Sequence, residues 1–151
     1  MALHKLLDRG VRALLDEHRG ELEAFVVARG LEVEAAVHLQ HALEAMPGLL
    51  LALDGALYHG DAPPAARTLF NTVLRYLLLE DDAVPAREGR ALVGHLDDLY
   101  LLHRAAQTLR AHVADLDFRS IDGGAELLAQ VLPPQIVSDL EEVLTRALEE
   151  D

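Results

Sequence analysis

Two acidic doublets and a histidine are the first side chains whose types and spacing suit metal binding. Residues 76–102 read YLLLEDDAVPAREGRALVGHLDDLYLL, with one doublet before the proline and one after the glycines. If the two leucine-rich arms pack as an antiparallel helical hairpin, its turn brings Asp82, Asp97 and Asp98 close together, with His95 beside them. Carboxylate oxygens are the ligands that Mg²⁺ and Ca²⁺ prefer. The first candidate is therefore a divalent metal site made of these four residues.

The same doublets have a structural alternative. Asp81 or Asp82 can cap the helix that begins near Pro85, by accepting hydrogen bonds from its free backbone N–H groups. Asp97 and Asp98 can then form ion pairs across or along the helix. The arginines available for those pairs are Arg87, Arg90 and Arg104. The stretch has neither the spacing of an EF-hand loop nor a glycine-rich phosphate loop.

A second candidate metal site lies earlier in the chain. Glu34, His38 and His41 are spaced by four and three residues, so a helix places them on one face. Such a face supplies half of a metal site and needs a ligand from another helix. The residues that can supply this ligand are His95, Asp98 and His103. The alternative is a solvated helical face beside the apolar residues Val33 and Val37.

His103 falls within the apolar spacing of a long helix. We predict a partly buried ring with one hydrogen-bonded nitrogen, which is a structural role. The chain holds eight histidines in all, so its stability or association is expected to depend on pH between about pH 5 and 8.

The sequence does not indicate an enzyme. Ser120 and Ser138 are the only serines, and neither sits in a nucleophile elbow. Paired carboxylates are too common in so acidic a chain to indicate acid–base catalysis.

Charge and composition exclude several classes of partner. Twenty-six acidic residues against thirteen Lys and Arg residues give a formal net charge of −13. This charge repels phosphate groups, so we expect no nucleic-acid partner and no attraction to anionic membranes. The chain has no cysteine, which is typical of a cytoplasmic protein and excludes a disulfide framework.

No segment of the sequence predicts export or a membrane span. The N-terminus carries charges every few residues and lacks the apolar core of a signal peptide. The longest uncharged runs, 45–53 and 127–138, fall well short of the ~20 residues that cross a bilayer. We therefore expect a soluble, cytoplasmic protein.

Apolar residues recur with helical spacing along nearly the whole chain, and no segment alternates like a strand. The predicted helices are one ending near 18–20, then 21–29, 31–45, a short buried helix over 47–58, one from 63–64 to 78, a long one from 85 or 88 to 115, a short one over 125–132, and a last one from 133–134 to 148. Short connections and a length of 151 residues predict an all-α fold, a single-domain orthogonal bundle of about six to seven helices over 1–151.

The region around the doublets resembles a known family. GDAPPAARTLF (60–70) opens a helix with proline, Tyr76-Leu77-Leu78 leads to Asp82 and Val84-Pro85, and the second arm begins Gly94-His95-Leu96-Asp97-Asp98. These features resemble the YkvA-type domain, a small bacterial helical hairpin of poorly defined role. Its pattern is a proline-opened helix, Y-L-x-x-P-x-D-x-I-P-D, a short turn and G-x-x-D-D followed by an apolar residue. The resemblance covers about 60–110.

The resemblance implies a helical hairpin and, through the apolar turn of that family, membrane association. In this chain Glu80 stands in place of the first proline and Ala86 in place of an aspartate, and the turn AREGRA (86–91) is strongly polar. A peripheral membrane role is therefore kept only as an alternative.

The leading functional prediction is a non-enzymatic interaction, scaffold or accessory protein that binds a protein partner or itself. Hydrophobic residues make up 51% of the chain, and the segment 47–58 is apolar on most faces. Such surplus apolar surface is buried when the protein associates with a partner or with itself. The alternative is a metal-binding protein or metal-dependent enzyme that uses the histidines and carboxylates above, and otherwise no cofactor is expected.

Overall fold

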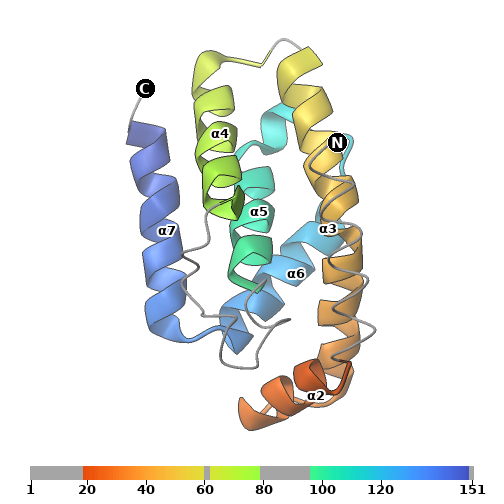
Figure 1. Cartoon of the computed structure of the whole chain (residues 1–151). Coiled ribbons are helices and arrows are strands. Elements are labelled where there is room, and N and C mark those ends of the chain that lie inside the picture. Colours follow the sequence, from red (N-terminus) through yellow and green to blue (C-terminus); the bar gives the residue numbers. More distant parts are fainter. Residues whose placement is uncertain (1–18, 60–61, 79–95, 150–151) are drawn as a thin grey trace.

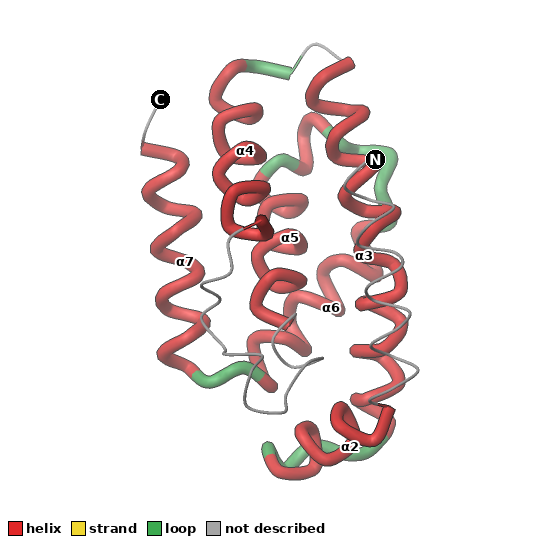
Figure 2. Tube along the Cα trace, in the orientation of Figure 1, coloured by secondary structure: helices red, strands yellow, loops and turns green. Residues whose placement is uncertain are grey.

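The computed structural model describes residues 19–59, 62–78 and 96–149, and in these ranges the chain forms α-helices and one 3₁₀ turn, without a strand (Figures 1 and 2). The helices are α2 (Arg19–Ala28), α3 (Glu34–His59), α4 (Pro64–Leu78), α5 (Leu96–Thr108), α6 (Phe118–Val131) and α7 (Pro134–Glu149), with the 3₁₀ turn η3 (Arg110–His112) after α5. The predicted all-α bundle is confirmed.

Helix α5 is the centre of the bundle. It contacts α3, α4, α6 and α7, and Figure 1 shows it between α4 and α7 on one side and α3 and α6 on the other. Each residue from Leu96 to His103 is buried. A helix that is buried on every side needs neighbours all round it, so α3, α4, α6 and α7 are arranged about α5.

The two arms of the predicted hairpin are α4 and α5. They contact each other and run antiparallel in Figure 1. The turn between them, with Asp82 and His95, lies outside the described residues, as does the predicted helix that ends near 18–20.

Helix α3 corrects one prediction. The predicted helices 31–45 and 47–58 are a single helix with Pro47 in its interior. A proline inside a helix removes one backbone hydrogen bond and costs about 3 kcal/mol. Buried residues continue across the proline with alternating spacings of four and three: Leu39, Leu43, Met46, Leu50, Leu53 and Leu57. Burial of this continuous stripe outweighs the local cost, which is why proline does not end the helix.

The helix boundaries after α5 also differ from the prediction. The long helix ends at Thr108 and not at 115, and α6 begins at Phe118, well before the predicted 125–132. Asp117 sets the new start, because its side chain accepts hydrogen bonds from the backbone N–H (3.3 Å) and the hydroxyl (2.8 Å) of Ser120. Such an N-cap satisfies the free donors of the first turn. The glycine pair at 123–124 therefore lies inside a helix and does not separate two.

No described helix is both long enough and apolar enough to cross a membrane. The longest, α3, carries the acidic residues Glu34, Glu44 and Asp54 along its length.

Helix α7 provides a matched test of the packing. Leu144 is buried and Leu148, one turn later, is 50% exposed. We expect Leu144→Ala to lower the free energy of unfolding by about 2–5 kcal/mol, because it leaves a cavity in the core. Leu148→Ala should change that energy by no more than about 0.5 kcal/mol. Urea denaturation of both variants measures the difference, and equal losses would show that α7 does not pack as described.

Candidate functional site

A cavity of about 830 Å³ lies between α3, α5 and α6. On the α3 side Ala45 and Gly48 are exposed, whereas His103 of α5 is buried, so the cavity runs from the surface to the central helix. The residues that line it are His38, Leu39, His41, Ala42, Ala45, Gly48, Leu49, Ala52, His103, Leu116, Asp117, Ser120, Ile121, Gly123, Gly124 and Leu127. The wall is mostly apolar, and a small number of polar groups interrupt it.

His103 is the buried polar group of this wall, with 5% of its surface exposed. Its Nδ1 lies 2.9 Å from the carbonyl oxygen of Leu99, one turn earlier in α5. A carbonyl oxygen only accepts, so Nδ1 carries the proton of the neutral ring and Nε2 is left as an acceptor. Burial lowers the pKa of His103 below its usual value, and the hydrogen bond to Leu99 opposes this only in part. The ring is therefore neutral at neutral pH.

Gly124 of α6 faces the Nε2 edge of this ring. A Cβ atom at position 124 would lie 2.9 Å from Nε2 and 3.1 Å from Cδ2 of His103. These distances are too short for an ordinary contact, so a larger residue would displace the ring. Gly124 inside α6 thus allows close packing of α6 against α5. A glycine inside a helical pattern often has such a packing reason.

The rim of the cavity carries a fixed negative charge. Hydrogen bonds from the hydroxyl and the backbone N–H of Ser120 lower the pKa of the Asp117 carboxyl below its usual range. Asp117 is therefore ionised at neutral pH. On the opposite wall, His38 and His41 of α3 are exposed and reach the same cavity.

The structure brings together only some of the predicted metal ligands. His38 and His41 line one cavity with His103, as the second candidate site requires, but Glu34 lies exposed on the first turn of α3 outside it. Asp97 and Asp98 are buried at the start of α5 and do not line the cavity.

The described residues contain no group of three or more His, Asp or Glu side chains placed to hold a metal ion. The first candidate site also needs Asp82 and His95, which lie outside the described residues. In the second acidic doublet, Oδ1 of Asp97 accepts a hydrogen bond from the backbone N–H of Asp98 at 2.9 Å. Both aspartate side chains have further interactions. The divalent metal site stays a prediction.

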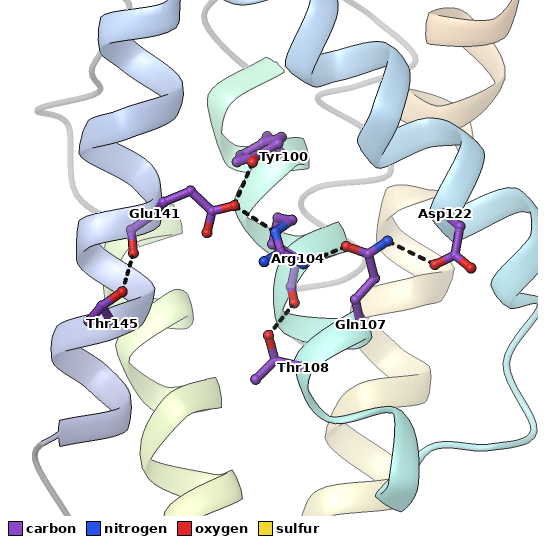
Figure 3. A network of polar contacts seen from close by, with 7 residues as sticks. All are labelled: Tyr100, Arg104, Gln107, Thr108, Asp122, Glu141 and Thr145. Carbon is purple, nitrogen blue, oxygen red and sulfur yellow. Dashed lines mark hydrogen bonds and ion pairs between the residues drawn. The ribbon is translucent and has the colours of Figure 1, made fainter.

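A polar network joins α5 to its neighbours (Figure 3). One oxygen of Glu141 in α7 accepts from the hydroxyl of Tyr100 at 2.8 Å and from Nε of Arg104 at 2.7 Å. Arg104 also donates to Gln107, whose amide donates to Asp122 of α6 at 2.8 Å. Arg104 thus pairs with Glu141 of another helix, and the network holds α5 in register with α6 and α7. Sequence reasoning missed this pairing.

We found no match to this chain among protein-family models, curated proteins or solved structures. The resemblance of 60–110 to the YkvA-type domain therefore stays a prediction that rests on the motif alone.

Tyr100 provides a titration test of the network. Burial, and then the hydrogen bond and charge of Glu141, raise its pKa from 10.0 to about 12. The chain has three tyrosines and no tryptophan, so phenolate absorbance can be followed without interference. We expect one phenol to titrate near pH 12 and this component to be missing from Tyr100→Phe.

The raised pKa of Tyr100 also determines how the stability of the fold changes at high pH. Because the folded pKa is raised, the contribution of Tyr100 to stability is complete below pH 10 and is lost as the pH rises toward 12. A wild-type titration with no late component would contradict the buried hydrogen bond to Glu141.

His103 predicts an acid-sensitive fold. Its pKa is lowered from 6.5 by burial, so the unfolded chain takes up a proton at a pH where the folded chain does not. The contribution of the neutral His103 ring to the free energy of unfolding is complete above about pH 6.5 and is lost as the pH falls below that value. The free energy of unfolding then falls by at most about 1.4 kcal/mol per pH unit. The other titratable groups that face the cavity are His38, His41 and Asp117.

The measurement is the unfolding free energy across this pH range for wild type and for His103→Phe. We expect the phenylalanine variant to flatten the profile, since it removes the titrating ring. His112→Phe is the control, because His112 is exposed in η3. If His103→Phe keeps the wild-type slope, the acid sensitivity has another origin.

Proposed function

We propose that this protein is a non-enzymatic helical interaction protein that self-associates through the outer face of α3. The large apolar side chains that stay exposed in the described part of the chain support this. They are Val27, Val33, Val37, Leu51, Tyr58 and Leu148. All except Leu148 belong to α2, α3 or the turn between them.

The spacing on α3 is the observation that carries the proposal. Val37, Leu51 and Tyr58 are separated by fourteen and seven residues, so they fall on one stripe of the helix, and the exposed Glu44 takes the heptad position between Val37 and Leu51. Between them lie Gly48 and Gly55, also seven residues apart. A heptad stripe of this kind is the pattern by which two helices pack along each other.

The two glycines strengthen this interpretation. Each lowers helix stability by about 1 kcal/mol relative to alanine. Apart from the neighbouring residues and backbone of α3 itself, no described atom lies within 4 Å of a Cβ placed at Gly48 or Gly55, so packing against the other described helices does not require glycine at either position. A second helix that approaches this face closely does require small residues there, and in this proposal that helix is α3 of a second copy.

The charge of the chain gives the association a distinctive salt dependence. Two copies that each carry a net charge of −13 repel each other, and added salt screens this repulsion. The proposed dimer should therefore become tighter as the salt concentration rises. The cytoplasm is the proposed location, supported by the lack of cysteine. The metal-binding and peripheral-membrane alternatives stay predictions.

A matched pair of variants tests the proposal. Leu51 is 48% exposed on α3 and Leu148 is 50% exposed on α7. We expect wild type and Leu148→Glu to form dimers in light scattering over a dilution series. Leu51→Glu should be monomeric, because it places a charge at the apolar position between Gly48 and Gly55. Circular dichroism should show that both variants keep the helical fold.

Two results would contradict the proposal. The first is a wild-type chain that is monomeric at every concentration and salt level. The second is an equal effect of Leu51→Glu and Leu148→Glu, which would place the contact away from α3.

A further inference from the structure

The cavity between α3, α5 and α6 contains a hydrogen-bond acceptor that the described part of the fold does not use. His103 is 95% buried, since 5% of its surface is exposed, and its Nδ1 is held by the carbonyl oxygen of Leu99. Its Nε2 has no hydrogen-bond partner among the described residues. The protein does not fully enclose this nitrogen, so a donor from water or from a ligand in the cavity can reach it.

The remainder of the wall suits an apolar molecule. Its apolar residues from α3 are Leu39, Ala42, Ala45, Leu49 and Ala52, and those from α6 and the turn before it are Leu116, Ile121 and Leu127. The volume of about 830 Å³ lies within the range of about 300–1,000 Å³ that is typical of small-molecule sites. Several of these residues are alanines, which leave the space open.

The charge around the cavity favours a ligand with an uncharged head group. The rim carries the ionised carboxylate of Asp117, and the whole chain has a net charge of −13, so an anionic head group is repelled. A cationic head group loses its hydration when it is buried beside a neutral imidazole, which is more costly than burial of a neutral group. A neutral group with an O–H donor satisfies Nε2 without either penalty.

We propose that this cavity binds a neutral amphiphile whose apolar body packs between α3 and α6 and whose hydroxyl group donates to Nε2 of His103. The site adjoins the proposed dimer contact, because Gly48 belongs to both, whereas Val37, Leu51 and Tyr58 do not line the cavity. Gly124 contributes by leaving room for the His103 ring in this orientation.

The test uses β-naphthol and its methyl ether as probes of the full chain. The two molecules have nearly the same apolar body, but only β-naphthol has the O–H donor. The chain has no tryptophan, so the fluorescence of the probes can be followed directly. We expect β-naphthol to bind wild type about three- to tenfold more tightly than the ether, which is the range for one neutral hydrogen bond.

Variants of the chain then test whether His103 accepts the hydrogen bond from the hydroxyl group of β-naphthol. His103→Phe keeps a ring of similar size and should bind both probes with the affinity that wild type has for the ether. His112→Phe, in the exposed η3 turn, should keep the preference for β-naphthol. Ala52→Phe fills the cavity from α3 and should weaken both probes at least tenfold. The anionic probe β-naphthoate should bind wild type more weakly than β-naphthol.

The proposal is overturned if wild type binds neither probe, or binds both equally. It is also overturned if His103→Phe keeps the preference, or if Ala52→Phe binds as wild type does. The comparison of the two probes on wild type needs no variant, so it decides the question even if a variant does not fold. Repeating it with Leu51→Glu separates this site from the dimer, because the preference should persist in the monomer.

Discussion

The burial of α5 on every side is the constraint on which the other features of this structure depend. Four helices cover it (Figure 1), and they supply most of the buried apolar residues. Burial also applies to the polar side chains of α5, which must find partners within the protein. The buried Tyr100 and the half-buried Arg104 share a single carboxylate oxygen of Glu141, and this shared acceptor fixes α7 against the central helix.

The same constraint gives His103 its chemical character. The ring is buried beside α6, its proton is placed on Nδ1 by the carbonyl oxygen of Leu99, and its pKa is lowered because charge is disfavoured there. A histidine on the surface would change both tautomer and charge readily. At this position it is a neutral acceptor of fixed orientation, and Gly124 is the neighbour that makes the orientation sterically possible.

Helix α3 serves three surfaces at once. One side supplies the long stripe of the core that continues past Pro47, and a second side forms the cavity wall. The third carries Val37 and Leu51 toward solvent, together with Tyr58, which stays partly exposed beside Asn71 and Phe70 of α4. A helix that is apolar on so many sides is expected to be buried. The two proposals assign separate occupants to the two sides that the described helices leave open, a second copy of the chain and a small neutral ligand.

The sequence by itself determined the class of fold, because the spacing of apolar residues within a helix is a local property of the chain. The same local pattern placed His103 on an apolar seam with one bonded nitrogen, which the structure confirms. It also placed His38 and His41 on one face of a helix. Each of these results needs only the residues within a few turns.

Only the tertiary structure decided where helices begin and end, and which side chains meet. The continuity of α3 through Pro47 depends on core contacts along its whole length, and these outweigh the local preference of proline. The cavity joins residues of α3, α5 and α6, from His38 to Leu127, and local spacing contains no information about such distant pairs. Gly124 is an example. Its close contact with His103 forms only when α6 packs against α5, so the sequence near Gly124 does not reveal it.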